Sequence, residues 1–205
     1  MRAATRTLTL LAATLVAAGC ARREGAAAPV AHDHHAATAA ADEPRASLHD
    51  LDLRWRDQRG AEVTLSAIDG DARVLALVYT SCEATCPLIV GSLKRIEASV
   101  PASKRAALRL VLVSLDPARD TPERLARWGA ESGLDPARWT LLSGSDAAVR
   151  ELAAALGVRY ARQPNGETAH TNVITVLDRD GAIAHQQTGL DASRTSIDAV
   201  ARLLP

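Results

Sequence analysis

Two of the three cysteines in this 205-residue chain, Cys82 and Cys86, stand four positions apart in the stretch YTSCEATCP. They follow an apolar run that ends at Tyr79, and they precede Pro87, which opens a segment with helical spacing. Proline favours the first helical position and disfavours helical backbone in the residue before it, so we expect Cys86 to cap this helix. The unpaired N–H groups and the positive end of the helix dipole would lower its pKa. Both sulfurs are therefore predicted to be placed for reaction rather than burial.

The spacing of the cysteines favours two kinds of chemistry. Residues 83–85 form a loop between the sulfurs, which can close a disulfide or bind a soft metal ion. Two thiolates alone suit Cu(I), an added imidazole also suits Cu(II), and zinc would normally need a fourth ligand. His170 lies in a polar stretch that could cover the start of the helix, so it is the candidate third ligand. His49 and His185 are interpreted as surface or core histidines.

The elements that must position these residues alternate between strands and helices. Apolar runs at 73–79 and 108–115 predict strands buried on both faces, and residues 87–100 between them predict a crossover helix. The other expected elements are a hairpin over 51–65 with Gly60 in its turn, a helix capped by Asp120 or Thr121, a helix from Ser145 and Asp146 to Gly157, a hairpin over 171–188 and a terminal helix over 193–204. This order predicts an α/β fold, a thioredoxin-like sandwich with an N-terminal β-hairpin.

The N-terminus predicts export from the cytoplasm. Arg2 and Arg6 precede an uncharged, mostly apolar run over 8–18, which is typical of a signal peptide and too short for a membrane span. The residues before Cys20 resemble the bacterial lipobox, which implies removal of residues 1–19 and lipidation of Cys20. The protein would then be anchored to a bacterial membrane by lipid. The alternative is an ordinary cut that yields a soluble secreted protein.

The rest of the chain divides into a tether and one domain. Residues 20–46 begin with the lipidated cysteine, are rich in alanine and have no other apolar periodicity, so they are interpreted as a flexible linker. His32, His34 and His35 in this linker could capture metal, or they could be incidental. Residues 47–205 are long enough for one domain with a proper core, so the cysteine pair is not needed to staple a small scaffold.

The charge balance excludes one class of partner. The chain has 24 basic and 24 acidic residues, so loss of Arg2 and Arg6 with the signal peptide leaves the mature protein slightly acidic. Binding to phosphate backbones needs a basic surface, so we expect no nucleic-acid partner.

Three motifs together resemble the Sco/SenC family of copper-binding proteins. They are YTSCEATCP, LVSLDPARDTPERL and AHTNVITVLDRDG, in this order, in a match from about residue 50 to the C-terminus. The resemblance implies a thioredoxin-like fold that binds copper, as Cu(I), Cu(II) or both, through Cys82, Cys86 and His170. It also implies a domain that faces the periplasm and delivers copper to, or prepares the thiols of, the copper-site subunit of cytochrome c oxidase. Another periplasmic copper protein could be the partner instead.

The match has departures and further shared positions. EAT fills the gap between the cysteines where family members usually have Pro or Asp, and Thr171 stands where Ser often follows the histidine. Neither change removes a ligand, but both concern the surface that meets the partner. Asp116 and Asp120 match the DPxxD positions of the family, which implies a role in copper transfer or on a partner surface. A turn around Pro117 and a helix cap at Asp120 would account for the same residues.

The leading hypothesis is a copper metallochaperone with no turnover of its own. The alternative is an enzyme, a thiol-disulfide oxidoreductase that uses Cys82 and Cys86, needs no metal and gives His170 no necessary role. Such enzymes usually carry a cis-proline immediately before the strand facing the cysteines, whereas TAHTNV has none and Pro164 is six residues from His170. A peroxidase is disfavoured because the PxxxTxxC motif is absent, and a structural disulfide in an exported domain is a third interpretation.

Overall fold

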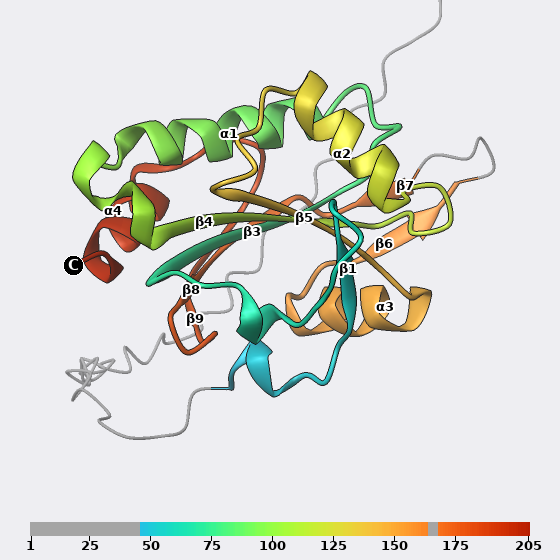
Figure 1. Cartoon of the computed structure of the whole chain (residues 1–205), viewed down its shortest axis with the longest axis horizontal. Helices are drawn as coiled ribbons and strands as arrows, with labels where there is room; N and C mark the ends of the chain where they lie inside the picture. Colours follow the sequence, from blue (N-terminus) through green and yellow to red (C-terminus); the bar gives the residue numbers. More distant parts are fainter. Residues whose placement is uncertain (1–45, 164–167) are drawn as a thin grey trace, which may run out of the picture. The chain divides into compact units, whose positions relative to one another are not determined.

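A computed structural model describes residues 46–163 and 168–205 of the chain, and these residues form a sheet with helices on both faces (Figure 1). The main sheet has the strand order β2-β1-β5-β4-β3-β8-β9, and β6 pairs with β7 in a separate small sheet. The strands are β1 (Trp55–Asp57), β2 (Glu62–Val63), β3 (Ala72–Val78), β4 (Leu108–Ser114), β5 (Trp139–Gly144), β6 (Tyr160–Arg162), β7 (Thr168–His170), β8 (Val173–Asp178) and β9 (Ile183–Thr188).

The centre of the main sheet is parallel and its margins are antiparallel. β3, β4 and β5 run in the same direction, β1 runs against β5, and β8 runs against β3. Every residue of β3 is buried, including Arg73, whose guanidinium donates to the backbone carbonyls of Ile68 and Asp178. A strand covered on both faces is expected to be mostly apolar, with any polar group hydrogen-bonded as Arg73 is, so the predicted central strands are confirmed.

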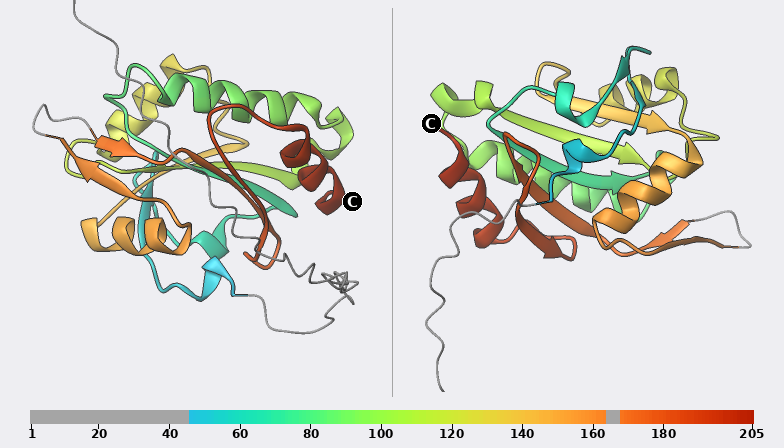
Figure 2. Two further views of the ribbon diagram at one scale, coloured as in Figure 1. Left: turned by 180° about the vertical axis from the view of Figure 1, so that it is seen from behind. Right: turned by 90° about the horizontal axis from the view of Figure 1, so that it is seen from below.

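Helices cover the two faces of the sheet with two separate cores. The helices are α1 (Cys86–Ser99), α2 (Pro122–Glu131), α3 (Asp146–Ala155) and α4 (Arg194–Leu203), with short 3-10 turns at Leu48–Asp50, Leu65–Ala67 and Ala102–Ala107. In Figures 1 and 2, α1, α2 and α4 lie on one face of the sheet and α3 lies on the other. Alternate residues of β3 serve the two sides: Val74 and Ala76 belong to one core, and Leu75 and Leu77 to the other.

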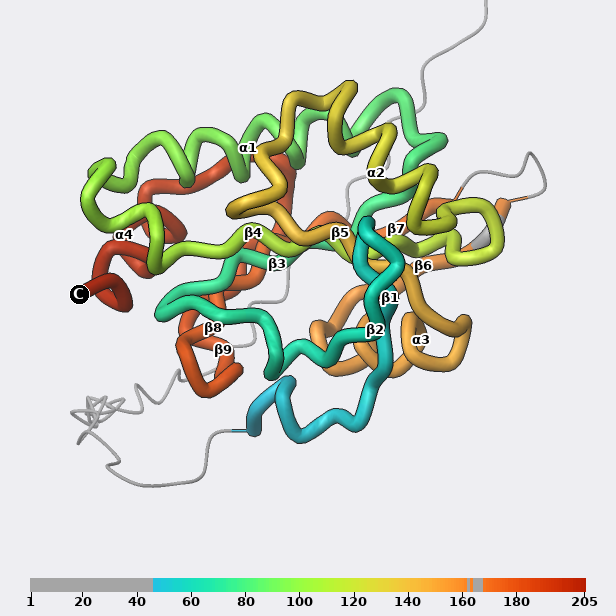
Figure 3. Tube along the Cα trace, viewed as in Figure 1, coloured from blue at the N-terminus to red at the C-terminus, as the bar shows by residue number. Residues whose placement is uncertain are grey.

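The crossover between the central strands β3 and β4 contains residues 79–86, which include both cysteines and are called the cysteine segment below. The trace in Figure 3 runs from β3 through α1 to the parallel strand β4, as the apolar periodicity predicts. Parallel neighbours need such a crossover because the chain must return to the same end of the sheet. The start of α1, with Cys82 just before it, therefore stands beyond the carboxyl end of β3.

Several predicted elements are confirmed, and three features differ from expectation. The first hairpin is confirmed with Gly60 in its turn at φ 82°, and the last hairpin and terminal helix are also present. The central strand β5 was not expected, because its run of Trp, Thr, Leu and Ser shows no clear period. The β6–β7 sheet was not expected either. The cap of α2 is Thr121, whose hydroxyl accepts the N–H of Arg124, and not Asp120.

Several sequence predictions concern segments outside the described residues. The signal peptide over 1–19, the lipid attachment at Cys20, the histidines His32, His34 and His35, and Pro164 all belong to these segments. Within residues 46–163 and 168–205, no helix is both long and apolar enough to cross a membrane.

Candidate metal centre

The candidate residues meet at one edge of the main sheet. β3 ends at Val78, which lies opposite Ser114 at the end of β4. β8 runs antiparallel to β3, so the residues just before β8 reach the same edge as the residues just after β3. A cavity of 670 Å³ opens there, and its lining includes Tyr79, Cys82 and His170. The topology thus brings together segments that are almost ninety positions apart in the sequence.

Cys82 is a half-buried thiol that accepts hydrogen bonds at the start of α1. The N–H of Cys86 donates to Cys82 Sγ at 3.3 Å, and Thr85 Oγ1 lies 3.3 Å from the same sulfur. Burial by itself raises the pKa of Cys82, but the bonds from Thr85 and Cys86 outweigh it and lower the pKa to about 7. Donors that stabilise the charged form lower a thiol pKa. Cys82 is therefore the reactive thiolate of the pair near neutral pH.

Cys86 corrects the prediction made for it from the sequence. It lies within the first turn of α1, after the cap residue Thr85, and only 1% of it is exposed. Burial, followed by its hydrogen bond to Cys82, raises the pKa of Cys86 well above its ordinary value. The helix N-terminus thus acidifies Cys82 and not Cys86, because the backbone N–H of Cys86 points back to the Cys82 sulfur. Only one of the two sulfurs is placed for reaction, and the other is buried.

Tyr79 stands between the cysteines and the candidate histidine. Its ring and the imidazole of His170 pack edge to face, with centroids 6.2 Å apart and planes at 73°. Burial, followed by a hydrogen bond to Cys82, raises the pKa of Tyr79 to about 12. The phenol therefore keeps its proton and can donate to the Cys82 sulfur. No pattern in the sequence singled out Tyr79, because its role depends on two neighbours distant from each other in the chain.

His170 presents an available nitrogen in the structure. Nδ1 lies 3.3 Å from the carbonyl oxygen of Thr171, which can only accept, so Nδ1 carries the proton. In the neutral ring, Nε2 then holds a lone pair, and it has no hydrogen-bond partner within the described residues. Burial lowers the pKa of His170, although the Thr171 carbonyl partly offsets this effect. A neutral imidazole with a free lone pair is the form that binds metals.

The donors fit copper by their chemistry but do not form a closed site in this conformation. Thiolate and imidazole are soft and intermediate ligands that suit Cu(I) and Cu(II). In the described part of the chain, however, no three side chains of His, Cys, Asp or Glu stand close enough together to hold a metal ion. Tyr79 contacts both His170 and Cys82. A metal that uses all three ligands must therefore draw His170 toward the cysteines.

The other predicted candidates lie elsewhere. His49 is half-buried near Gly181, and His185 is half-buried in β9 with Thr195 as its neighbour, so neither lines this cavity. Asp116 and Asp120 are buried, with 0% and 1% exposure, so their side chains do not form a partner surface in this conformation. Their expected role in copper transfer stays a prediction. The helix cap suggested for Asp120 is wrong, because its carboxylate binds other groups.

Comparison with known proteins decides the family. The SCO1/SenC family model matches residues 42–205, which is most of the chain and includes both cysteines and His170. The chain belongs to the SCO1/SenC family. The resemblance inferred from the three motifs is thereby confirmed.

Relatives of this family member share its sequence at low identity and its fold over most of their length. It is 27% identical over 157 residues to a Stutzerimonas stutzeri protein that carries the name of a copper-binding protein, covering 75% of this chain and 74% of that one. It is 24% identical over 140 residues to the Bacillus subtilis SCO1 homologue, covering 67% and 72%. The copper-bound structure of Bradyrhizobium japonicum ScoI has a TM-score of 0.62 at 24% identity, covering 74% of this chain and 94% of that one. The thioredoxin-like fold class is confirmed.

Proposed function

We propose that this SCO1/SenC protein binds one copper ion through Cys82, Cys86 and His170 as a metallochaperone. It delivers the copper to, or prepares the thiols of, the copper site of cytochrome c oxidase or another periplasmic copper protein. Supporting names come from relatives: ScoI of Bradyrhizobium japonicum has a structure with copper bound, and BsSco is described as a member of a family of cytochrome c oxidase assembly proteins.

One observation carries the proposal. Cys82, whose thiol pKa is lowered, and His170 line the same cavity, and among the described residues Nε2 of His170 has no hydrogen-bond partner. A buried polar atom without a hydrogen bond is costly, so binding of a ligand by this nitrogen would remove an unfavourable feature of the free protein. A copper ion could bind both this nitrogen and the sulfur of Cys82.

The chain's own residues prepare this binding. The Cys82 thiolate is charged near neutral pH and can accept the metal directly, whereas Cys86 must lose its proton when it coordinates. The Nδ1 bond to Thr171 orients His170 and leaves Nε2 for the metal. Binding of copper therefore releases between one and two protons near pH 7, one from Cys86 and about half of one from Cys82, whose pKa is about 7.

Copper titration of the reduced protein tests the proposal. We expect one copper per chain, with an intense sulfur-to-metal charge-transfer band for Cu(II) that is lost when Cys82 and Cys86 form a disulfide. Cys82→Ser and Cys86→Ser should each weaken Cu(II) binding and shift the band, because each removes one of the two sulfur ligands. His185→Ala is the matched control for histidine loss, because His185 lies outside the cavity. Equal copper binding by the oxidised protein would contradict the assignment.

Substitution of His170 separates copper binding from thiol chemistry. His170→Ala removes one nitrogen ligand and leaves both sulfurs, so Cu(II) affinity should fall by about tenfold or more while Cu(I) affinity falls less. The rate of thiol-disulfide exchange should change little, because it depends on the thiols. A variant that keeps full Cu(II) affinity but loses reductase activity would favour the oxidoreductase instead.

The oxidoreductase remains the second candidate because of one specific observation. The pair combines an accessible thiolate of pKa about 7 with a buried, protonated thiol one helical turn away. Cys82 could attack one sulfur of a partner disulfide and release the other as a thiolate. Cys86, after losing its proton, would then attack Cys82 and release the reduced partner dithiol. Reduction of about one equivalent of a disulfide substrate by the reduced, metal-free protein, with formation of the Cys82–Cys86 disulfide, retained in His170→Ala, would support this activity.

We further propose that the protein is exported and held at a bacterial membrane by lipid on Cys20, with the domain facing the periplasm. The support is the apolar run after Arg2 and Arg6 and the small residues before Cys20. A single lipidated cysteine explains why a third cysteine stands so far from the pair.

A further inference from the structure

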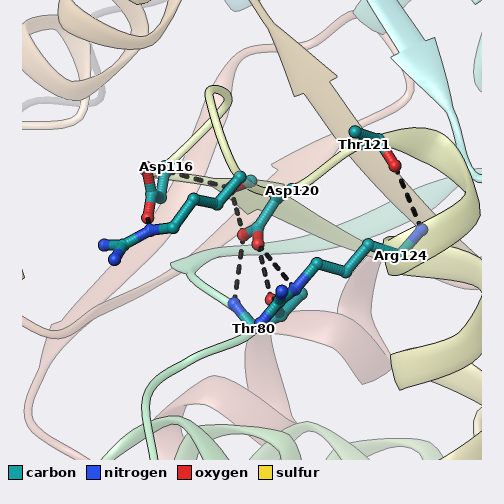
Figure 4. A network of polar contacts seen from close by, with 7 residues as sticks. Thr80, Asp116, Asp120, Thr121 and Arg124 are labelled. Carbon is teal, nitrogen blue, oxygen red and sulfur yellow. Dashed lines mark hydrogen bonds and ion pairs between the residues drawn. The ribbon is translucent and has the colours of Figure 1, made fainter.

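Asp120 is a buried carboxylate just before α2 that binds Thr80, which follows β3 and precedes the cysteines (Figure 4). Its Oδ2 accepts the backbone N–H of Thr80 at 3.0 Å and the hydroxyl of Ser114 at 2.5 Å. Its Oδ1 accepts the hydroxyl of Thr80 at 2.5 Å. Arg124 Nε lies 3.7 Å from the same Oδ1 and also donates to Thr80 Oγ1 at 2.6 Å.

These contacts join three elements at the carboxyl edge of the sheet. Ser114 ends β4, Arg124 lies in the first turn of α2, and Thr80 follows β3. Thr121 caps α2, so the helix does not need the Asp120 side chain. A buried charge is tolerated only when it is well paired, and removal of one partner leaves the others unsatisfied. The carboxylate therefore fixes Thr80 against β4 and α2.

Thr80 is two residues before Cys82, within one tight turn. The N–H of Cys82 donates to the carbonyl of Tyr79 at 3.1 Å, so Thr80 lies inside one hydrogen-bonded turn that ends at Cys82. Tyr79 in turn packs on His170. A group that holds Thr80 thus determines where the Cys82 sulfur stands relative to the imidazole.

We propose that Asp120 is a positioning residue for the copper site, acting through Thr80 on Cys82. The inference rests on the proposed copper-binding function and adds a residue that does not touch the metal. Outer residues that orient metal ligands typically contribute tenfold or more to affinity, because a ligand held in place loses less freedom on binding.

Four variants test this proposal. Asp120→Asn removes the charge at constant size, and Thr80→Val removes the hydroxyl while keeping the backbone N–H. Thr80→Ser restores a hydroxyl and is the conservative rescue. Asp57→Asn is the matched control, since Asp57 is an equally buried carboxylate in β1 that binds Arg59 and the N–H of Ala61, away from the cavity.

Two sets of measurements read out the positions of the ligands. The first is amide hydrogen exchange at Thr80 and Cys82 in copper-free protein, together with the free energy of unfolding. The second is Cu(II) affinity and the position of the charge-transfer band. We expect Asp120→Asn and Thr80→Val to speed exchange at both amides, to shift the band and to weaken Cu(II) binding by about tenfold. Thr80→Ser should resemble the wild type, and Asp57→Asn should lose stability without a shift of the band.

The outcomes separate this inference from the proposed function. If wild-type protein binds no copper, the proposed function fails, but amide exchange still tests whether Asp120 holds the cysteine segment. If the wild type binds copper and Asp120→Asn and Thr80→Val leave the band and affinity unchanged, the inference is overturned. A band shift in Asp57→Asn equal to that in Asp120→Asn would also overturn it, because the effect would then follow from general destabilisation. Should Asp120→Asn fail to fold, Thr80→Val and Thr80→Ser alone carry the decision.

Discussion

At the scale of single residues, the two cysteines differ although they share a motif. Cys82 lies outside the helix and accepts a hydrogen bond from its first residue, whereas Cys86 is buried within the first turn of α1 with 1% exposure. The same helix start therefore lowers one pKa while burial raises the other. The pair therefore consists of a half-buried thiol that ionises near neutral pH, Cys82, and a buried thiol that keeps its proton, Cys86.

This division predicts the pH dependence of alkylation. Since the thiolate is the nucleophile, the reaction of Cys82 with iodoacetamide should rise with pH, with a midpoint of about 7, and level off above it. Cys82→Ser should remove this fast phase. In Cys86→Ser the fast phase should persist, because the Thr85 hydroxyl and the backbone N–H of residue 86 remain and the serine hydroxyl can still donate to the Cys82 sulfur in place of the thiol. Rates measured by mass spectrometry decide the matter, and a fast phase assigned to Cys86 would contradict the structure.

At the scale of elements, α1 both positions the cysteines and covers the sheet. Its buried face includes Ile89, Leu93 and Ile96, which pack on the core shared with β3 and β4. Leu88 is 54% exposed on the other side, one turn from the cavity. Thr85 forms no capping bond, so the helix start is stabilised by packing along its inner face and by the bond from the Cys86 N–H to the Cys82 sulfur.

Two leucines of this helix provide a matched test of packing. Leu93 is fully buried, so Leu93→Ala should lower the free energy of unfolding by about 3 kcal/mol through lost burial and the cavity left behind. Leu88→Ala makes the same chemical change at an exposed site and should cost about 0.5 kcal/mol or less. Urea denaturation of the copper-free protein measures both values. Equal losses for the two variants would mean that α1 does not pack as described.

At the scale of the whole molecule, the described domain has two cores on either side of one sheet. The central strands contribute side chains to both cores. They therefore connect the sheet edge that carries Cys82 and His170 to α1 and α4 on one face and to α3 on the other. Two cores of this size do not need a disulfide for stability, and both Cys82 and Cys86 are free thiols in the folded domain. Reduction should therefore leave the fold intact.

Membrane attachment belongs to the same scale and is a proposal for the N-terminal segment. Cys20→Ser should release the protein from the membrane or stall its processing, because lipid chains contribute about 0.8 kcal/mol per buried methylene and the tether has little charge to replace them. Fractionation of cells that produce the wild type and the variant measures this. Unchanged membrane association of the variant would indicate ordinary cleavage and a protein partner.

The sequence by itself determined most of the local structure and the identity of the candidate ligands. Apolar runs specify β3 and β4, and proline with helical spacing specifies α1, because these patterns depend on neighbours along the chain. Short segments such as β5 and the β6–β7 pair lack a clear period and form only where a partner strand receives them. Cys82, Cys86 and His170 could be named from motifs, but their distances could not.

Only the tertiary structure decided how the candidate residues behave. The order of pKa values in the cysteine pair depends on which sulfur is covered by the sheet and which receives the N–H of residue 86. The contact of Tyr79 with His170, and of Asp120 with Thr80, joins residues far apart in the chain. These contacts form because β8 pairs antiparallel with β3 and the crossover places β4 beside it. The burial and hydrogen bonds that shift the pKa values of these side chains exist only after those strands have packed together.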